Sequence, residues 1–166
     1  MAAIIGLNNE IIENVCNEVK GIITIANYNC PGQVVVSGQK KSVEKACELL
    51  KINGAKRVIM LPVGGAFHSP LMNSAKNTLT EEIEKINFNT PICPIYQNFS
   101  NNPETDPVKI KFNIIKQITS PVKWSQCIEK MIKNGTNKFI EVGPGKVLHG
   151  LVKKINPSVE ISSAVF

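Results

Sequence analysis

Four short apolar runs alternate with two helical patterns over the first sixty residues, and this order limits the fold more than any other feature. The four predicted strands are residues 2–7, 22–26, 33–37 and 57–61. Apolar side chains recur at helical spacing over residues 11–19 and 43–50, and a glycine follows each helix. Residues 29–32, Asn-Cys-Pro-Gly, predict a turn between the second and third strands. The order of elements is therefore β-α-β-β-α-β.

This order predicts an α+β unit with a ferredoxin-like arrangement over residues 1–61. Residues 62–166 predict an α/β region whose strands are residues 94–98 and 138–142. Two or three strands are too few for a self-sufficient α/β sheet. We therefore interpret the first unit as an insert in a host domain that begins before residue 1. A sheet cut open in this way is expected to expose part of its core surface.

The helices of the second region have clear start signals. Ser69-Pro70 and Asp106-Pro107 each place a capping side chain before a proline at the first helical position. A further helix begins near Trp124, and the last covers residues 147–155 after the turn Gly143-Pro144-Gly145. The helix that starts at Asp106 is expected to have an apolar stripe made by Val108, Phe112, Ile115 and Ile118.

Composition excludes several classes of protein. The net charge is +6, but the lysines are spread out and do not alternate with aromatic residues, so no nucleic-acid partner is predicted. No apolar run approaches the roughly 18 residues of a membrane span, and no signal peptide is visible. Five scattered cysteines without a C-x-x-C pair are typical of reduced thiols and predict a cytoplasmic protein. Two histidines far apart in sequence predict no metal site.

His68 is the first candidate for chemistry. It lies in residues 64–70, Gly-Gly-Ala-Phe-His-Ser-Pro, between a strand and a helix start, where α/β folds gather ligands. It is either a general base or a histidine that bonds to the backbone. Cys30 is a weaker candidate, as a nucleophile beside His68. Residues 143–145 can bind an anion or form a plain turn, and residues 27–32 can line a polar pocket or form a hairpin turn.

Four segments taken together resemble malonyl-CoA:acyl carrier protein transacylases and the acyltransferase domains of fatty acid and polyketide synthases. They are residues 65–72 (GAFHSPLM), 27–38 (NYNCPGQVVVSG), 117–124 (QITSPVKW) and 141–148 (EVGPGKVL). Their order and spacing fit the family along essentially the whole chain. The resemblance implies that residues 62–166 are the C-terminal part of an α/β-hydrolase-like acyltransferase core.

The resemblance also implies a ping-pong transfer of malonyl from CoA to the phosphopantetheine thiol of acyl carrier protein. His68 matches the general base of the family, and Gln117 matches the residue whose backbone carbonyl holds that base. Phe67 matches a position where malonyl-selective members carry Phe, and Asn29 matches a polar residue at the mouth of the gorge. No cofactor is implied beyond the CoA thioester substrate. The full-length enzyme is expected to be monomeric.

Three motifs of the family are not found in the sequence. They are the early G-Q-G-x-Q loop, the G-H-S-x-G serine and the arginine that pairs with the malonyl carboxylate; Arg57 is the one arginine and lies elsewhere. We therefore expect this chain alone to be inactive, because it has the base without the nucleophile. The alternatives are a piece of a polyketide synthase acyltransferase domain and a non-catalytic fragment that binds the carrier protein.

Overall fold

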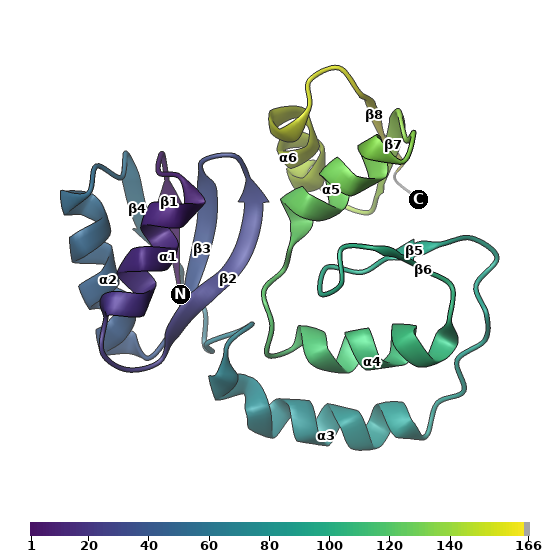
Figure 1. Ribbon diagram of the computed structural model, residues 1–166, viewed down its shortest axis with the longest axis horizontal. Coiled ribbons are helices and arrows are strands. Elements are labelled where there is room, and N and C mark those ends of the chain that lie inside the picture. The colour runs from purple at the N-terminus through teal and green to yellow at the C-terminus, as the bar shows by residue number, and fades with distance from the viewer. Residues whose placement is uncertain (165–166) are drawn as a thin grey trace.

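The structure is a computed structural model and describes residues 1–164. Its helices are α1 (Asn9–Glu18), α2 (Lys40–Ile52), the 3-10 helix η1 (Pro70–Met72), α3 (Asn73–Glu84), α4 (Pro107–Gln117), α5 (Trp124–Lys133) and α6 (Val147–Ile155). Its strands are β1 (Ala2–Ile5), β2 (Ile23–Cys30), β3 (Gln33–Gly38), β4 (Arg57–Met60), β5 (Ile95–Tyr96), β6 (Pro103–Glu104), β7 (Lys138–Val142) and β8 (Glu160–Ala164). Figure 1 shows three groups: β1–β4 with α1 and α2, then α3 and α4 with β5 and β6, and finally α5 and α6 with β7 and β8.

The first group is an antiparallel sheet in the order β2-β3-β1-β4, with α1 and α2 packed on one face. Side chains alternate along a strand, so Ala2 and Ile4 point to the same face and are both fully buried. Leu50 of α2 is buried with them in the same cluster. The predicted β-α-β-β-α-β order is confirmed, and its apolar alternation is what places the two helices on that face.

The predicted end of the second strand was wrong. β2 continues to Cys30 because its residues pair with β3, with Tyr28 opposite Val34 and Cys30 opposite Gln33. Two irregularities in the pairing accommodate the extra length. The turn is therefore shorter than residues 29–32, and Asn29 lies within a strand.

The second group confirms both cap signals. Ser69 accepts a hydrogen bond from the Leu71 backbone at the start of η1, which leads into α3. Asp106 accepts one from the Val108 backbone at the start of α4. The structure also contains β6, which the sequence did not predict; it pairs with β5, a shorter strand than expected.

The apolar stripe predicted for α4 was wrong in part, because two of its residues are exposed. Val108 and Phe112 are 74% and 51% exposed, whereas Ile110 and Asn113 are buried. Apolar residues lie on both sides of this helix, so the periodicity did not determine which side faces inward. The buried side is the one that faces α3 and β5, and it carries a polar residue.

The third group contains a two-stranded parallel sheet, β7 and β8, in which β8 was not predicted. One face packs on α5 and α6 through Phe139 and Ile161. On the other face, Ile140 and Val142 are 56% and 66% exposed. Parallel sheets are normally covered on both faces, so this one has the exposed core surface that the sequence led us to expect.

The helices also show what kinds of site the described chain offers. Within residues 1–164, no helix is long and apolar enough to cross a membrane. In the same residues, no group of three or more His, Cys, Asp or Glu side chains is placed to hold a metal ion.

Candidate active site

His68 lies in the loop after β4, next to Ser69, which is the N-cap of η1. Its backbone has φ of 58°, a left-handed conformation that is uncommon for a residue other than glycine. The next residue, Ser69, is fully buried; its hydroxyl donates to the Ala66 carbonyl at 2.6 Å and accepts from the Leu71 N–H at 3.3 Å. Ser69 therefore fixes the loop on one side of His68, and the surrounding structure holds the unusual backbone conformation.

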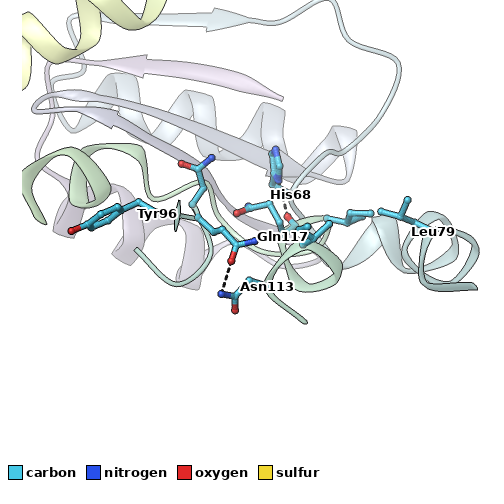
Figure 2. A pocket seen from close by; sticks show the side chains of 9 residues that line it. His68, Leu79, Tyr96, Asn113 and Gln117 are labelled. Atoms are coloured by element: carbon cyan, nitrogen blue, oxygen red, sulfur yellow. Dashed lines mark hydrogen bonds between the residues drawn. The ribbon is translucent and has the colours of Figure 1, made fainter. Parts of the chain in front are cut away.

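The His68 ring faces the end of α4. Its Nδ1 lies 3.0 Å from the backbone carbonyl oxygen of Gln117 (Figure 2). A carbonyl can only accept a hydrogen bond, so this contact selects the tautomer with the proton on Nδ1. Nε2 then carries the lone pair and can take up a proton. The contact that the family resemblance implies is therefore present, although the catalytic role of both residues stays a prediction.

His68 lines a pocket of about 430 Å³ between α3, β5 and α4 (Figure 2). The other lining residues are Leu79, Tyr96, Gln97, Asn98, Asn113, Ile114, Gln117 and Ile118. Asn113 donates to the Gln97 side chain at 2.9 Å, and Gln97 donates to the Ile110 carbonyl at 3.0 Å. Sequence reasoning missed this amide pair, and the one signal for it was Asn113, a polar residue inside a helix with apolar residues on both sides.

Two other predicted site residues lie elsewhere. Phe67 is 44% exposed and is not among the residues that line the His68 pocket. Asn29 is half-buried in β2 and is also absent from that pocket. The structure therefore brings His68 and Gln117 together but does not join Phe67 and Asn29 to them.

Cys30 does not have the surroundings of a nucleophile. Its side chain is buried, and its thiol donates to the Gln33 side chain at 3.8 Å. Burial raises the pKa of the Cys30 thiol, against a smaller opposing effect of Lys154. A raised pKa reduces the thiolate fraction that attack would need. Cys30 also lines a pocket that His68 does not share.

The helix start after Gly143-Pro144-Gly145 already has an anion. Both carboxylate oxygens of Glu141 accept hydrogen bonds from the first turn of α6, from the Leu148 N–H at 3.1 Å and from the His149 N–H at 2.8 Å. A carboxylate at this end is stabilised by the helix dipole. The structure therefore favours the plain turn over an external anion site.

The sequence matches known proteins over nearly its whole length. The acyl transferase domain family matches residues 2–165. The malonyl CoA-acyl carrier protein transacylase of Bacillus subtilis is 45% identical over 159 residues, which are 94% of this chain and 50% of that protein. The Staphylococcus aureus (strain COL) protein of the same name is 42% identical over 166 residues, covering 98% of this chain and 54% of that one. The chain thus spans about half the length of the curated relatives it matches.

Solved structures give the same result. An acyl carrier protein S-malonyltransferase from Vibrio cholerae superposes with a TM-score of 0.95 at 44% identity, over 98% of this chain and 54% of that one. A malonyl-transacylase in complex with a type II PKS acyl-carrier protein superposes with a TM-score of 0.92 at 36% identity, over 99% and 53%. With both the family match and these superpositions covering nearly every residue, the chain belongs to the acyl transferase domain family.

Proposed function

We propose that this chain is the part of a malonyl-CoA:acyl carrier protein transacylase that supplies the general base, His68. The observation that carries the proposal is the 3.0 Å contact between His68 Nδ1 and the Gln117 carbonyl, within a pocket large enough to admit a substrate group. The names of the relatives support malonyl as the transferred group. The nucleophile is then a serine in the remainder of the domain.

In the first half of the proposed reaction, His68 Nε2 takes the serine hydroxyl proton. The serine Oγ forms a bond to the malonyl carbonyl carbon, and the bond from that carbon to the CoA sulfur breaks. The imidazolium returns its proton to the leaving sulfur. The Gln117 carbonyl fixes the ring orientation without adding a full charge, in the place that an aspartate has in a triad.

In the second half, the phosphopantetheine thiol of a carrier protein gives its proton to His68 Nε2 and attacks the malonyl ester. The serine oxygen leaves and recovers the proton, so the enzyme returns to its starting state. The solved complex of a malonyl-transacylase with a type II PKS acyl-carrier protein supports this class of partner. Its 36% identity to this chain also keeps a polyketide carrier among the candidates.

We extend the proposal to Phe67 and Asn29, to the two parts of the chain and to the complete enzyme. Phe67 restricts an α-substituent on the substrate, and Asn29 lies at the mouth of the gorge in the complete enzyme. Residues 1–61 form a ferredoxin-like subdomain, and residues 62–166 form the C-terminal part of an α/β-hydrolase-like core. The complete enzyme is a cytoplasmic monomer that uses no cofactor other than its CoA thioester substrate.

The first test is the intact mass of the purified chain after incubation with malonyl-CoA. We expect no added malonyl group, because the proposed nucleophile lies outside these residues. A stable malonyl adduct would place a nucleophile within the chain and contradict the proposal.

The second test supplies the N-terminal half of the Bacillus subtilis relative in trans and measures malonyl transfer to a carrier protein. We expect transfer that His68→Ala reduces by about 10²- to 10⁴-fold, the usual contribution of a general base. The matched control is His149→Ala, which removes the other histidine of the chain. Transfer that is equally fast with His68→Ala would show that His68 is not the base. Carrier binding without any transfer would favour the non-catalytic fragment.

A further inference from the structure

Gln117 contributes two different groups to the surroundings of His68. Its backbone carbonyl lies 3.0 Å from His68 Nδ1 and also accepts from the Ser120 N–H at 3.3 Å. Its side-chain Nε2 donates to the Ser120 carbonyl at 3.0 Å and to the Pro121 carbonyl at 3.2 Å. The residue thus holds the turn after α4 through its main chain and its side chain together.

This turn is also fixed to the first sheet. The Val122 N–H donates to the Ala26 carbonyl at 2.7 Å, and the Tyr28 N–H donates to the Val122 carbonyl at 2.9 Å. Val122 therefore adds a short parallel bridge to the edge of β2. Backbone hydrogen bonds therefore join β2 to Val122, and the Gln117 side chain joins the adjacent residues 120 and 121 to the end of α4. The Gln117 carbonyl at that end faces His68.

The other end of the Gln117 side chain shows what the residue contributes. Its Oε1 is buried and has no hydrogen-bond partner within residues 1–164. An unpaired buried acceptor costs free energy, and an apolar side chain of the same size would avoid that cost. The two bonds donated by Nε2 are therefore what this side chain adds to the structure.

The need for these bonds follows from the position of Gln117 at the end of a helix. α4 ends at Gln117, and the last carbonyls of a helix have no intrahelical donor. Their direction depends on how the following turn is held. Because the amide holds residues 120 and 121, it also sets the direction of the Gln117 carbonyl.

We propose that Gln117 is a positioning residue through its side-chain amide. By holding the turn after α4, this amide directs the Gln117 carbonyl at His68 Nδ1 and keeps the ring in the Nδ1–H tautomer. This inference rests on the proposed function of His68 as a base, because proton transfer requires the lone pair on Nε2. It differs from the backbone contact itself, because it assigns a role to the side chain of Gln117 and not only to its main-chain carbonyl.

The test is the tautomer of His68 in the isotope-labelled 166-residue chain, measured by ¹⁵N NMR at pH 8. We expect the Nδ1–H form in the wild type. In Gln117→Met, which keeps the length of the side chain and removes the donor, we expect a mixture that contains Nε2–H. In the enzyme completed in trans, the same variant should lower kcat by roughly 10²-fold through misplacement of the base, with the KM for malonyl-CoA nearly unchanged.

The matched control is Gln39→Met. Gln39 also ties a turn through its side chain, accepting from the Ile22 N–H at 3.0 Å, but it lies in the first sheet unit. This variant should lower stability and leave the His68 tautomer unchanged. If Gln117→Met does not fold, Gln117→Glu, which keeps the shape and replaces the donor with an acceptor, is measured by the same criterion.

The outcomes separate this inference from the proposed function. A folded Gln117 variant that retains the wild-type Nδ1–H population would overturn the positioning role, whether or not the completed enzyme transfers malonyl. A shifted tautomer, in a chain whose completed wild-type form transfers no malonyl, would support the positioning role and reject the transacylase.

Discussion

The two regions of the chain bury their apolar side chains to very different extents. Residues 1–61 enclose one continuous core of 14 buried residues between a four-stranded sheet and two helices. In residues 62–164, the core cluster contains three buried residues, Ile128, Val152 and Val159. The exposed apolar side chains, such as Ile140 and Val142, lie mostly in this second region. The first region therefore has a core of its own, whereas the second has a small core and leaves much of its apolar surface exposed.

The candidate site lies in the less packed region, and polar contacts rather than a core hold it in place. His68, Gln117 and Asn113 are fixed by hydrogen bonds to backbone or amide groups. The turn beside them is joined to β2 of the first region. The position of the His68 ring therefore depends on these hydrogen bonds and on the attachment of the turn to the well-packed region.

The largest expected effect comes from removing a side chain from the larger core. Leu50 is fully buried in the first region, and Leu50→Ala should lower the free energy of unfolding by about 2–5 kcal/mol. Ile128→Ala, in the small cluster of the second region, should cost about 2 kcal/mol, near the low end of that range, because half-buried neighbours can close around the gap. Urea unfolding of both variants measures the difference. If Ile128→Ala lowered the free energy of unfolding by as much as Leu50→Ala or more, the second region would be packed at least as well as the first.

A smaller effect is expected from alkaline pH. Burial raises the pKa of the Cys16 thiol from 9.0 to about 11, with smaller contributions from Cys47 and Glu13. Because the folded state keeps the proton more tightly, the stabilising effect is complete below pH 9 and is lost as pH rises from 9 to 11. The loss from this one thiol is at most about 3 kcal/mol.

This pH dependence can be measured from urea midpoints at pH 8 and pH 11. Cys16→Ala should reduce the fall in stability between the two pH values, and Cys93→Ala, which removes an exposed thiol, should not.

Cys127 in the second region has a pKa raised to about 11 by burial as well. If the second region opens more readily, a thiol reagent at pH 9 should modify Cys127 before Cys16. The opposite order would contradict the comparison.

The sequence predicted the first region better than the second for a physical reason. A strand or helix that faces one core has its apolar residues at regular spacing on one side. This is the case for the strand that contains Ile4 and the helix that contains Leu50. In the second region, β8 was missed, and the apolar residues of α4 pointed to the wrong face, because Val108 and Phe112 are exposed there. The cap signals at Ser69 and Asp106 were correct in both cases, since they depend on local contacts.

The site divides in the same way. His68 and Gln117 could be proposed from the sequence through the family resemblance, and their contact is present. The amide pair of Asn113 and Gln97 could not be, because it joins residues that are 16 apart in sequence and belong to different elements. The side-chain role of Gln117 was also hidden, since its donated bonds depend on the conformation of the turn.

The smallest expected effects come from one helix cap in each region. Asn8 accepts from the Ile11 N–H at 2.9 Å at the start of α1, and Asp106 accepts from the Val108 N–H at 2.8 Å at the start of α4. Replacing either by Ala should cost about 1 kcal/mol. Asn8→Ala should lower the stability of the whole first region, because α1 packs into its continuous core. Asp106→Ala should instead increase hydrogen exchange within α4 and leave the first region unchanged, because no residue of α4 belongs to the core cluster of the first region. If Asp106→Ala lowered protection in β1 and β3 by the same amount, the chain would unfold as one cooperative unit.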